Sequence, residues 1–201
     1  KRRVMRVKSH PVLLVLSGPS GVGKTTVAQR LLSRNDHLAR VVTCTTRAPR
    51  EGEMNGVDYH FLGKVEFLRR VESEEFLEYA EVYGKLYGTM KSSVCEMLAL
   101  GLDVLLVNDV QGAMAIRAMA DQDIKLNEAL TTVCLMTNGV NELRKRLKMR
   151  NEDDLEEIEE RLAIAEMEME QKDCFDHVVV SGTKDADWKR LQAIYDLAKN
   201  G

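Results

Sequence analysis

The chain has 201 residues, a formal net charge of −3 at pH 7, 44% hydrophobic residues and 30% charged residues. These values are ordinary for a globular protein that buries one core. They argue against a general nucleic-acid binder or a membrane-surface binder, and no apolar run is long enough to cross a bilayer.

The first predicted elements are a short buried strand at 12–16 and a helix that begins near Lys24 and carries an apolar stripe over 27–32. Between them stands Gly18-x-x-x-x-Gly23-Lys24-Thr25, a full match to the P-loop pattern. Its glycines let backbone N–H groups approach an anion, and the positive end of the helix adds to that field. Lys24 is expected to reach the β- and γ-phosphates, and the Thr25 hydroxyl to ligate Mg²⁺. The predicted ATP-binding residues are Gly18, Pro19, Ser20, Gly21, Val22, Gly23, Lys24, Thr25 and Thr26.

Further strands and helices are predicted to alternate along the rest of the chain. The strands are expected at 40–43, 57–62, 76–82, 85–87, 104–107, 131–136 and 175–180. The helices are expected at 64–73, 90–100, 113–119, 143–147, 151–171 and 185–199. This alternation after a P-loop predicts an α/β fold, with a three-layer core in which helices cover both faces of a parallel sheet. The segment 44–89 has too few helices for another βαβ unit and is expected to be a small mixed insertion.

A second anion site is predicted in the loop after the strand at 40–43. Arg47 and Arg50 lie three residues apart across Pro49, which stiffens the turn, and paired guanidinium groups can clamp a phosphate. Tyr59 and Tyr87 can add hydroxyl donors to the same anion. The alternative, two solvated arginines beside an acidic loop, is less attractive here because a kinase needs a second anion site.

Several motifs then follow one another in a specific order. They are Thr-Cys-Thr-Thr-Arg-Ala-Pro-Arg from position 43, Asn-Gly-Val-Asp-Tyr from 55, Phe-Leu-Glu from 76, Leu-Tyr-Gly-Thr from 86 and Asn-Asp-Val-Gln-Gly from 108. Together with the P-loop, this order resembles the guanylate kinase family from about residue 12 to the end. The resemblance implies transfer of the γ-phosphoryl group of MgATP to GMP. It also implies three regions: a core over 1–43, 90–138 and 172–201, a GMP-binding region over 44–89 and a helical lid over 139–171.

The resemblance also assigns roles to individual residues. Glu78 would accept hydrogen bonds from guanine N1 and N2 together with Asp109, which would also help to place Mg²⁺ through water. The chemistry agrees, since guanine offers adjacent donors there and adenine offers none. Thr43 and Thr89 would bind the edge of the base. The residues implied to hold the GMP phosphate are Arg47, Arg50, Tyr59 and Tyr87, and those implied to act in catalysis are Lys24, Arg47, Arg146, Arg150 and Arg161, the last three converging from the lid.

Two features of the sequence depart from this picture or stand outside it. Val107 occupies a position where members of the family usually carry an acidic residue, which puts the placement of Mg²⁺ in question. Ten carboxylates lie between residues 152 and 170, and we expect them to form the solvated face of a helix rather than a metal site.

Two alternative functions stay open at this stage. One is a kinase for another nucleotide or small phosphorylated acceptor, and the other is a non-catalytic guanylate-kinase-like interaction domain. The expected partners are small substrates rather than nucleic acid or membrane, and the sequence predicts no oligomeric state. The four cysteines are widely spaced and lack metal-ligand spacing, which favours a reducing compartment. We expect a cytoplasmic protein. The alternative is an organelle location after removal of a transit peptide.

Overall fold

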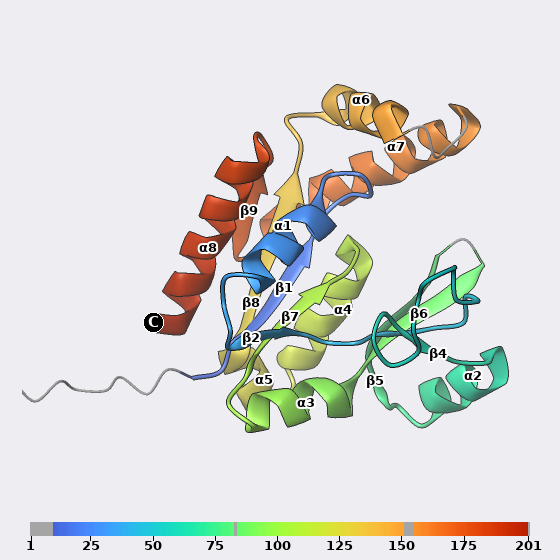
Figure 1. The fold of residues 1–201 in the computed structure, drawn as a ribbon, viewed down its shortest axis with the longest axis vertical. Helices are drawn as coiled ribbons and strands as arrows, with labels where there is room; N and C mark the ends of the chain where they lie inside the picture. The colour runs from blue at the N-terminus through green and yellow to red at the C-terminus, as the bar shows by residue number, and fades with distance from the viewer. Residues whose placement is uncertain (1–9, 83, 151–154, 201) are drawn as a thin grey trace, which may run out of the picture.

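The computed structural model describes residues 10–82, 84–150 and 155–200. Its centre is a five-stranded sheet in the order β2-β7-β1-β8-β9, and every neighbouring pair of strands in it is parallel. The strands are β1 (Leu13–Ser17), β2 (Leu38–Arg40), β7 (Asp103–Val107), β8 (Leu130–Met136) and β9 (His177–Val180). The predicted α/β fold with a parallel sheet is confirmed (Figure 1).

Alternate residues of β1 pack into two separate cores, one on each face of the sheet. Leu13 and Val15 belong to one core, whereas Leu14 and Leu16 belong to the other. This is why the strand is apolar throughout instead of alternating with polar residues. Both cores bury their central side chains almost completely, so the core domain has three layers.

Helices cover both faces of this sheet (Figure 1). On one face lie α1 (Lys24–Leu32) and α8 (Lys184–Asn200), and the other face is covered by α3 (Lys91–Ala99), α4 (Val110–Ala120) and α5 (Ile124–Ala129). The short helix α5 is absent from the sequence prediction. A buried network fixes the last helix, because Asp103 accepts hydrogen bonds from the Tyr195 hydroxyl and the Lys199 ammonium, both at 2.5 Å.

A second sheet forms most of the insertion between β2 and α3. Its strands run in the order β4-β3-β6-β5 and are β3 (Cys44–Thr45), β4 (His60–Phe61), β5 (Phe76–Val82) and β6 (Lys85–Met90). The pairing is mixed, parallel for β3 with β4 and antiparallel elsewhere. Helix α2 (Lys64–Glu72) packs on this sheet through Phe67, which stacks on Phe76. The predicted mixed insertion therefore has its own small core.

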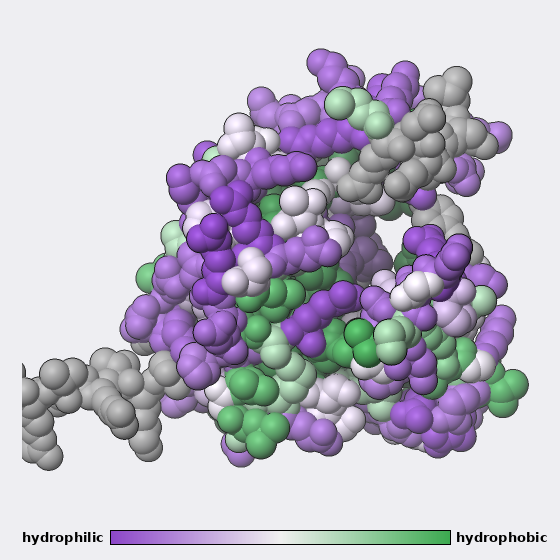
Figure 2. All heavy atoms as spheres, viewed as in Figure 1, coloured by the Kyte–Doolittle hydropathy of each residue, from purple (hydrophilic) through white to green (hydrophobic). Residues whose placement is uncertain are grey.

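A helix pair rises from the carboxyl end of the central sheet. Helices α6 (Val140–Arg150) and α7 (Leu155–Glu170) pack through a shared apolar cluster that includes Leu143, Leu147 and Leu162. A short 3₁₀ helix, Gln171–Cys174, follows α7. In the space-filling view a hollow separates this helix pair from the insertion (Figure 2). Among the described residues, no helix is both long and apolar enough to span a bilayer.

Some predicted boundaries were wrong. The strand expected at 40–43 ends at Arg40, and the strand expected at 57–62 is only His60–Phe61. The helix expected at 143–147 is longer and spans Val140–Arg150. The expected start of the acidic helix, 151–154, lies outside the described residues.

Candidate active site

The P-loop turn is shaped by three glycines with left-handed backbones. Gly18 has φ 134°, Gly21 has φ 85° and Gly23 has φ 111°. A side chain at Gly18 would not fit, since an added Cβ would lie 1.9 Å from the carbonyl oxygen of Leu135 on the neighbouring strand. Gly23 is the N-cap residue of α1, so the turn leads directly into the positive end of a helix, where an anion is favoured.

Lys24 holds its side chain back over this turn. Its ammonium donates hydrogen bonds to the carbonyl oxygens of Gly18 and Pro19, the second at 3.0 Å. Thr25 and Thr26 follow in the first turn of α1 and are exposed, so their hydroxyls are accessible to a ligand. The predicted ATP-binding residues 18–26 therefore form one continuous cradle at the carboxyl end of β1.

A cavity of about 400 Å³ adjoins the cradle on the side of α6. Arg146 of α6 lies in its wall and donates to the carbonyl oxygen of Val22 at 2.9 Å and to the Ser181 hydroxyl at 2.8 Å. Buried Asp187 holds the same segment, accepting from the Ser181 hydroxyl at 2.7 Å and from the Gly182 N–H at 2.8 Å. Arg146 thus contacts the P-loop, and its convergence with Arg150 and Arg161 on the transferred phosphoryl group stays a prediction. The sequence analysis did not predict the hydrogen bond between Ser181 and Asp187, because the segment after the last strand carries no phosphate-binding motif.

A second pocket, of about 210 Å³, lies between β5 and β6 of the insertion and the end of β7. Five of the predicted GMP-binding residues line it: Thr43, Tyr59, Glu78, Tyr87 and Asp109. They come from separate stretches of the chain, so their meeting in one pocket is a result of the fold. Val107 and Asn108 also line it, and they were not among the predicted site residues.

The Glu78 carboxylate is the central polar group of this acceptor pocket. It accepts a hydrogen bond at 2.6 Å from the hydroxyl of Thr89, which is fully buried behind it. The other carboxylate oxygen of Glu78 lies close to helix α4, as a Cβ added at Gly112 would be only 3.0 Å from this oxygen. Burial, with a smaller contribution from the charge of Asp109, raises the pKa of Glu78 to about 7, against the effect of Thr89. Asp109 is itself the N-cap of α4, accepting from the Gly112 N–H at 2.7 Å.

Arg47 lies beside this pocket in an aromatic and acidic setting. Its guanidinium is 5.5 Å from the ring centroid of Tyr59 and 5.8 Å from that of Phe61. Hydrogen bonding to Glu53, and less strongly to Tyr87, raises the pKa of Arg47 above its ordinary value. The side chain of Arg50 is exposed and does not line the acceptor pocket. Arg47 does not line it either, but it is half-buried and lies over Tyr59, which does line the pocket, so the predicted arginine pair is split between a half-buried and an exposed member.

Glu168 is an acidic residue of the site that sequence reasoning missed. Most of the described carboxylates of α7 are exposed as expected, but Glu168 is only 7% exposed. Burial and the charge of Asp109 raise its pKa, whereas the charge of Lys24 and a hydrogen bond from the Val110 N–H lower it. The prediction of a solvated face is wrong at this position. The last turns of α7 reach into the core beside the P-loop lysine.

The remaining predicted lid residues are less closely defined. Arg161 lies on α7 and is half-buried. Arg150 ends α6, and its side chain lies outside the described part of the structure. Among the described residues there is no cluster of three or more His, Cys, Asp or Glu side chains that could hold a metal ion.

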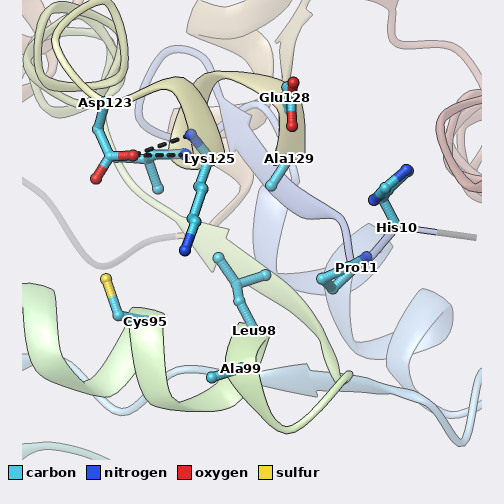
Figure 3. A pocket seen from close by; sticks show the side chains of 10 residues that line it. His10, Pro11, Cys95, Leu98, Ala99, Asp123, Lys125, Glu128 and Ala129 are labelled. Carbon is cyan, nitrogen blue, oxygen red and sulfur yellow. Dashed lines mark hydrogen bonds between the residues drawn. The ribbon is translucent and has the colours of Figure 1, made fainter.

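A larger cavity, of about 560 Å³, lies at the opposite end of the sheet (Figure 3). His10, Cys95 and Lys125 line its rim, and Asp123 uses its carboxylate to cap α5 by accepting from the Lys125 and Leu126 N–H groups. Ligands of open parallel sheets bind at the carboxyl ends of the strands. His10 stands before β1, at the amino end, so we assign the function to the two pockets at the other end.

A P-loop core with a second, carboxylate-bearing pocket opposite it defines a P-loop kinase with a small acceptor. The guanylate kinase family model matches residues 10–197. The chain is 43% identical over 192 residues to the guanylate kinase of Wolbachia sp. subsp. Brugia malayi (strain TRS), covering 96% of this chain and 95% of that protein. It is 41% identical over 178 residues to that of Maricaulis maris (strain MCS10), covering 89% and 79%. The chain belongs to the guanylate kinase family.

The structural comparison agrees with the sequence comparison. The crystal structure of guanylate kinase from Anaplasma phagocytophilum superposes with a TM-score of 0.75 and 31% sequence identity, covering 96% of this chain and 89% of that one. These comparisons confirm three predictions: the resemblance to the guanylate kinase family, the P-loop fold and the assignment as a kinase.

Proposed function

We propose that this chain catalyses ATP + GMP → ADP + GDP. The observation that carries the proposal is the acceptor pocket, in which the half-buried carboxylate of Glu78 is held by Thr89 and lies near the end of β7. Guanine presents N1–H and N2–H side by side, and one carboxylate can accept from both, whereas adenine has no such pair. Family membership supports the same acceptor, and it disfavours both a kinase for another substrate and a non-catalytic domain.

We assign a separate role to each of three regions. The core comprises 1–43, 90–138 and 172–201, the GMP-binding region is 44–89 and the lid is 139–171. The P-loop residues 18–26 would hold the phosphates of ATP, with Lys24 at the β- and γ-phosphates. Arg47, Tyr59 and Tyr87 would hold the phosphate of GMP, and Arg50 would have to turn inward to join them. Thr43 and Asp109 would complete the contacts to the base.

Catalysis by these residues would consist of positioning and charge neutralisation. Phosphoryl transfer leaves little covalent work to the protein, because the negative charge spreads over the oxygens of the transferred group. Lys24 and the lid arginines Arg146, Arg150 and Arg161 would balance that charge. The attacking oxygen belongs to an ionised phosphate, so the chain needs no general base.

The residues present fit a Mg²⁺ ion that is bound chiefly through the nucleotide. Mg²⁺ usually keeps several waters and binds through substrate phosphates and one or two protein oxygens. The exposed Thr25 hydroxyl stands at the start of α1, and Asp109 is close enough to Glu168 for their charges to interact, as Lys24 is. Thr25 would ligate the ion and Asp109 would act through water. Mg²⁺ would supply neutralisation of the phosphate charge.

A cytoplasmic location fits this function. Free cysteines are typical of reducing compartments, and Cys44, Cys95, Cys134 and Cys174 are all free in the structure.

The test is a coupled assay of ADP formation with MgATP and each of GMP, dGMP, AMP, UMP and CMP. We expect turnover with GMP at least a hundredfold above that with the other bases, and a Glu78→Gln variant should lose most of this preference. Equal use of AMP would contradict the assignment of the acceptor pocket. GMP binding without turnover would instead favour the interaction domain.

A further inference from the structure

The Arg47 side chain is held by one acidic residue, Glu53, through two parallel hydrogen bonds. Nη1 donates to Oε2 at 2.9 Å and Nη2 donates to Oε1 at 2.8 Å. Such a fork-to-fork pair fixes the plane of the guanidinium as well as its position. Both side chains are mostly shielded from water, with exposed fractions of 16% for Arg47 and 20% for Glu53.

The remaining donors of Arg47 leave one edge suited to a phosphate. Nη1 also donates to the carbonyl oxygen of Ala48 at 2.7 Å, so Glu53 and Ala48 engage both N–H groups of Nη1 and one of Nη2. Since a guanidinium carries N–H groups on Nε, Nη1 and Nη2, the edge formed by Nε and the second N–H of Nη2 is the one that can still bind an oxyanion through two hydrogen bonds. Tyr87 lines the acceptor pocket and lies near enough to the same guanidinium to raise its pKa.

Glu53 also fixes the turn that carries both arginines. Its Oε2 accepts a hydrogen bond from the backbone N–H of Arg50 at 2.7 Å, and its own N–H donates to the carbonyl oxygen of Arg50 at 3.1 Å. The Glu53 carboxylate therefore bonds to both the Arg47 side chain and the Arg50 backbone, and so closes the turn from Arg47 to Glu53. The turn also carries Glu51, so its two guanidinium groups are matched by two carboxylates and its formal charge is zero.

We propose that Glu53 is a positioning residue for the acceptor phosphate: it orients Arg47 so that its Nε–Nη2 edge faces the acceptor pocket. The inference rests on the proposed function, since it takes the phosphate of GMP as the anion. Glu53 does not touch the substrate. It acts by restricting Arg47 before the substrate binds, which lowers the entropy lost when the phosphate is clamped.

The test compares two ligands that differ only in the phosphate. Binding of GMP and of guanosine is measured by calorimetry for the wild-type chain and for Glu53→Gln, in which the amide can no longer accept from both nitrogens. We expect the Kd for GMP to rise about tenfold and the Kd for guanosine to stay within twofold. In steady-state assays the KM for GMP should rise by a similar factor, and the KM for ATP should not change.

A matched control is available in the same insertion. Glu66 of α2 also pairs with arginines, at 2.9 Å to Arg69 and 2.8 Å to Arg70, but neither of these arginines is among the residues proposed to hold the phosphate of GMP. Glu66→Gln makes the same chemical change in a comparable ion pair, and GMP binding should be unchanged. If Glu53→Gln fails to fold by circular dichroism, Glu53→Asp is measured in its place, and a smaller loss confined to GMP is expected.

The outcomes separate this inference from the proposed function. If the wild-type chain phosphorylates GMP and Glu53→Gln binds GMP equally well, the positioning role is refuted and the function stands. An equal loss of GMP and guanosine would also refute it, because the damage would then extend to the base pocket. A wild-type chain that neither binds nor phosphorylates GMP would overturn both.

Discussion

Guanine binding is expected to weaken as the pH falls from 8 to 6, because of the environment of Glu78. Burial, together with the charge of Asp109, raises the pKa of this carboxyl to about 7. At pH 8 the ionised group can accept both guanine donors. At pH 6 one oxygen carries a hydrogen and cannot accept, so binding must first expel that proton. Linkage then predicts a loss of affinity of roughly tenfold for each pH unit below 7.

The same shift predicts an opposite effect on the stability of the ligand-free protein. The folded-state pKa of about 7 lies above the ordinary value of 4.5, so the folded state holds this proton more tightly than the unfolded state does. The stabilising contribution is full below pH 4.5 and is lost as the pH rises from 4.5 through 7. At roughly 1.4 kcal/mol for each pH unit, the loss above pH 7 is of the order of 3 kcal/mol. Glu78→Gln, which cannot ionise, should therefore unfold at higher urea than the wild type at pH 8.

The assay is a series of guanosine titrations between pH 5.5 and 8, with urea unfolding at the same pH values. Guanosine is used because the phosphate of GMP itself gains a proton near pH 6. Glu78→Gln should bind guanosine weakly and with little dependence on pH. A wild-type affinity that is flat from pH 8 to pH 6, or a Gln variant that keeps the wild-type slope, would refute the role given to Glu78.

Three further predictions concern the P-loop and the anchoring of the last helix. Lys24→Ala should lower kcat roughly a hundred- to a thousandfold while the circular dichroism spectrum stays unchanged, and normal turnover would remove Lys24 from catalysis. Gly18→Ala should raise the KM for ATP and lower the Tm, since its Cβ would lie 1.9 Å from the Leu135 carbonyl oxygen; a variant with wild-type values for both would contradict this packing. Tyr195→Phe should lower the free energy of unfolding in urea by about 2 kcal/mol, because the fully buried carboxylate of Asp103 loses a hydrogen bond, and a change below the error of the measurement would contradict the network.

The elements of the central sheet could be predicted because their signals are local. Each of the strands β1, β7 and β8 contains a short run of apolar residues, which is the pattern that burial on both faces demands. The P-loop carries its geometry in its own glycines. Strands β3 and β4 could not be predicted well, since each has two residues and exists through pairing with a distant segment. Helix α5 has six residues, too few for a helical period to be read.

The residues of the site also divide into those that have a local signal in the sequence and those that do not. Glu53 stands six residues from Arg47, and an acid so close to two arginines is a local signal that could have been read as their partner. Glu168 offers no such signal. It lies in a stretch of similar acidic residues, and only the packing of α7 against the core decides which one is buried. The pocket around Glu78 likewise depends on how the insertion meets the end of β7.

The position of Glu168 bears on the departure noted at Val107. An acidic residue at the end of β7 would place a negative charge near the P-loop, and valine provides none. Glu168 reaches the same neighbourhood from α7, close enough for its charge to interact with those of Lys24 and Asp109. Glu168 thus places a carboxylate near the P-loop lysine although residue 107 is apolar. This charge comes from the last turns of α7, so the site has an acid near Lys24 while β7 ends in an apolar side chain.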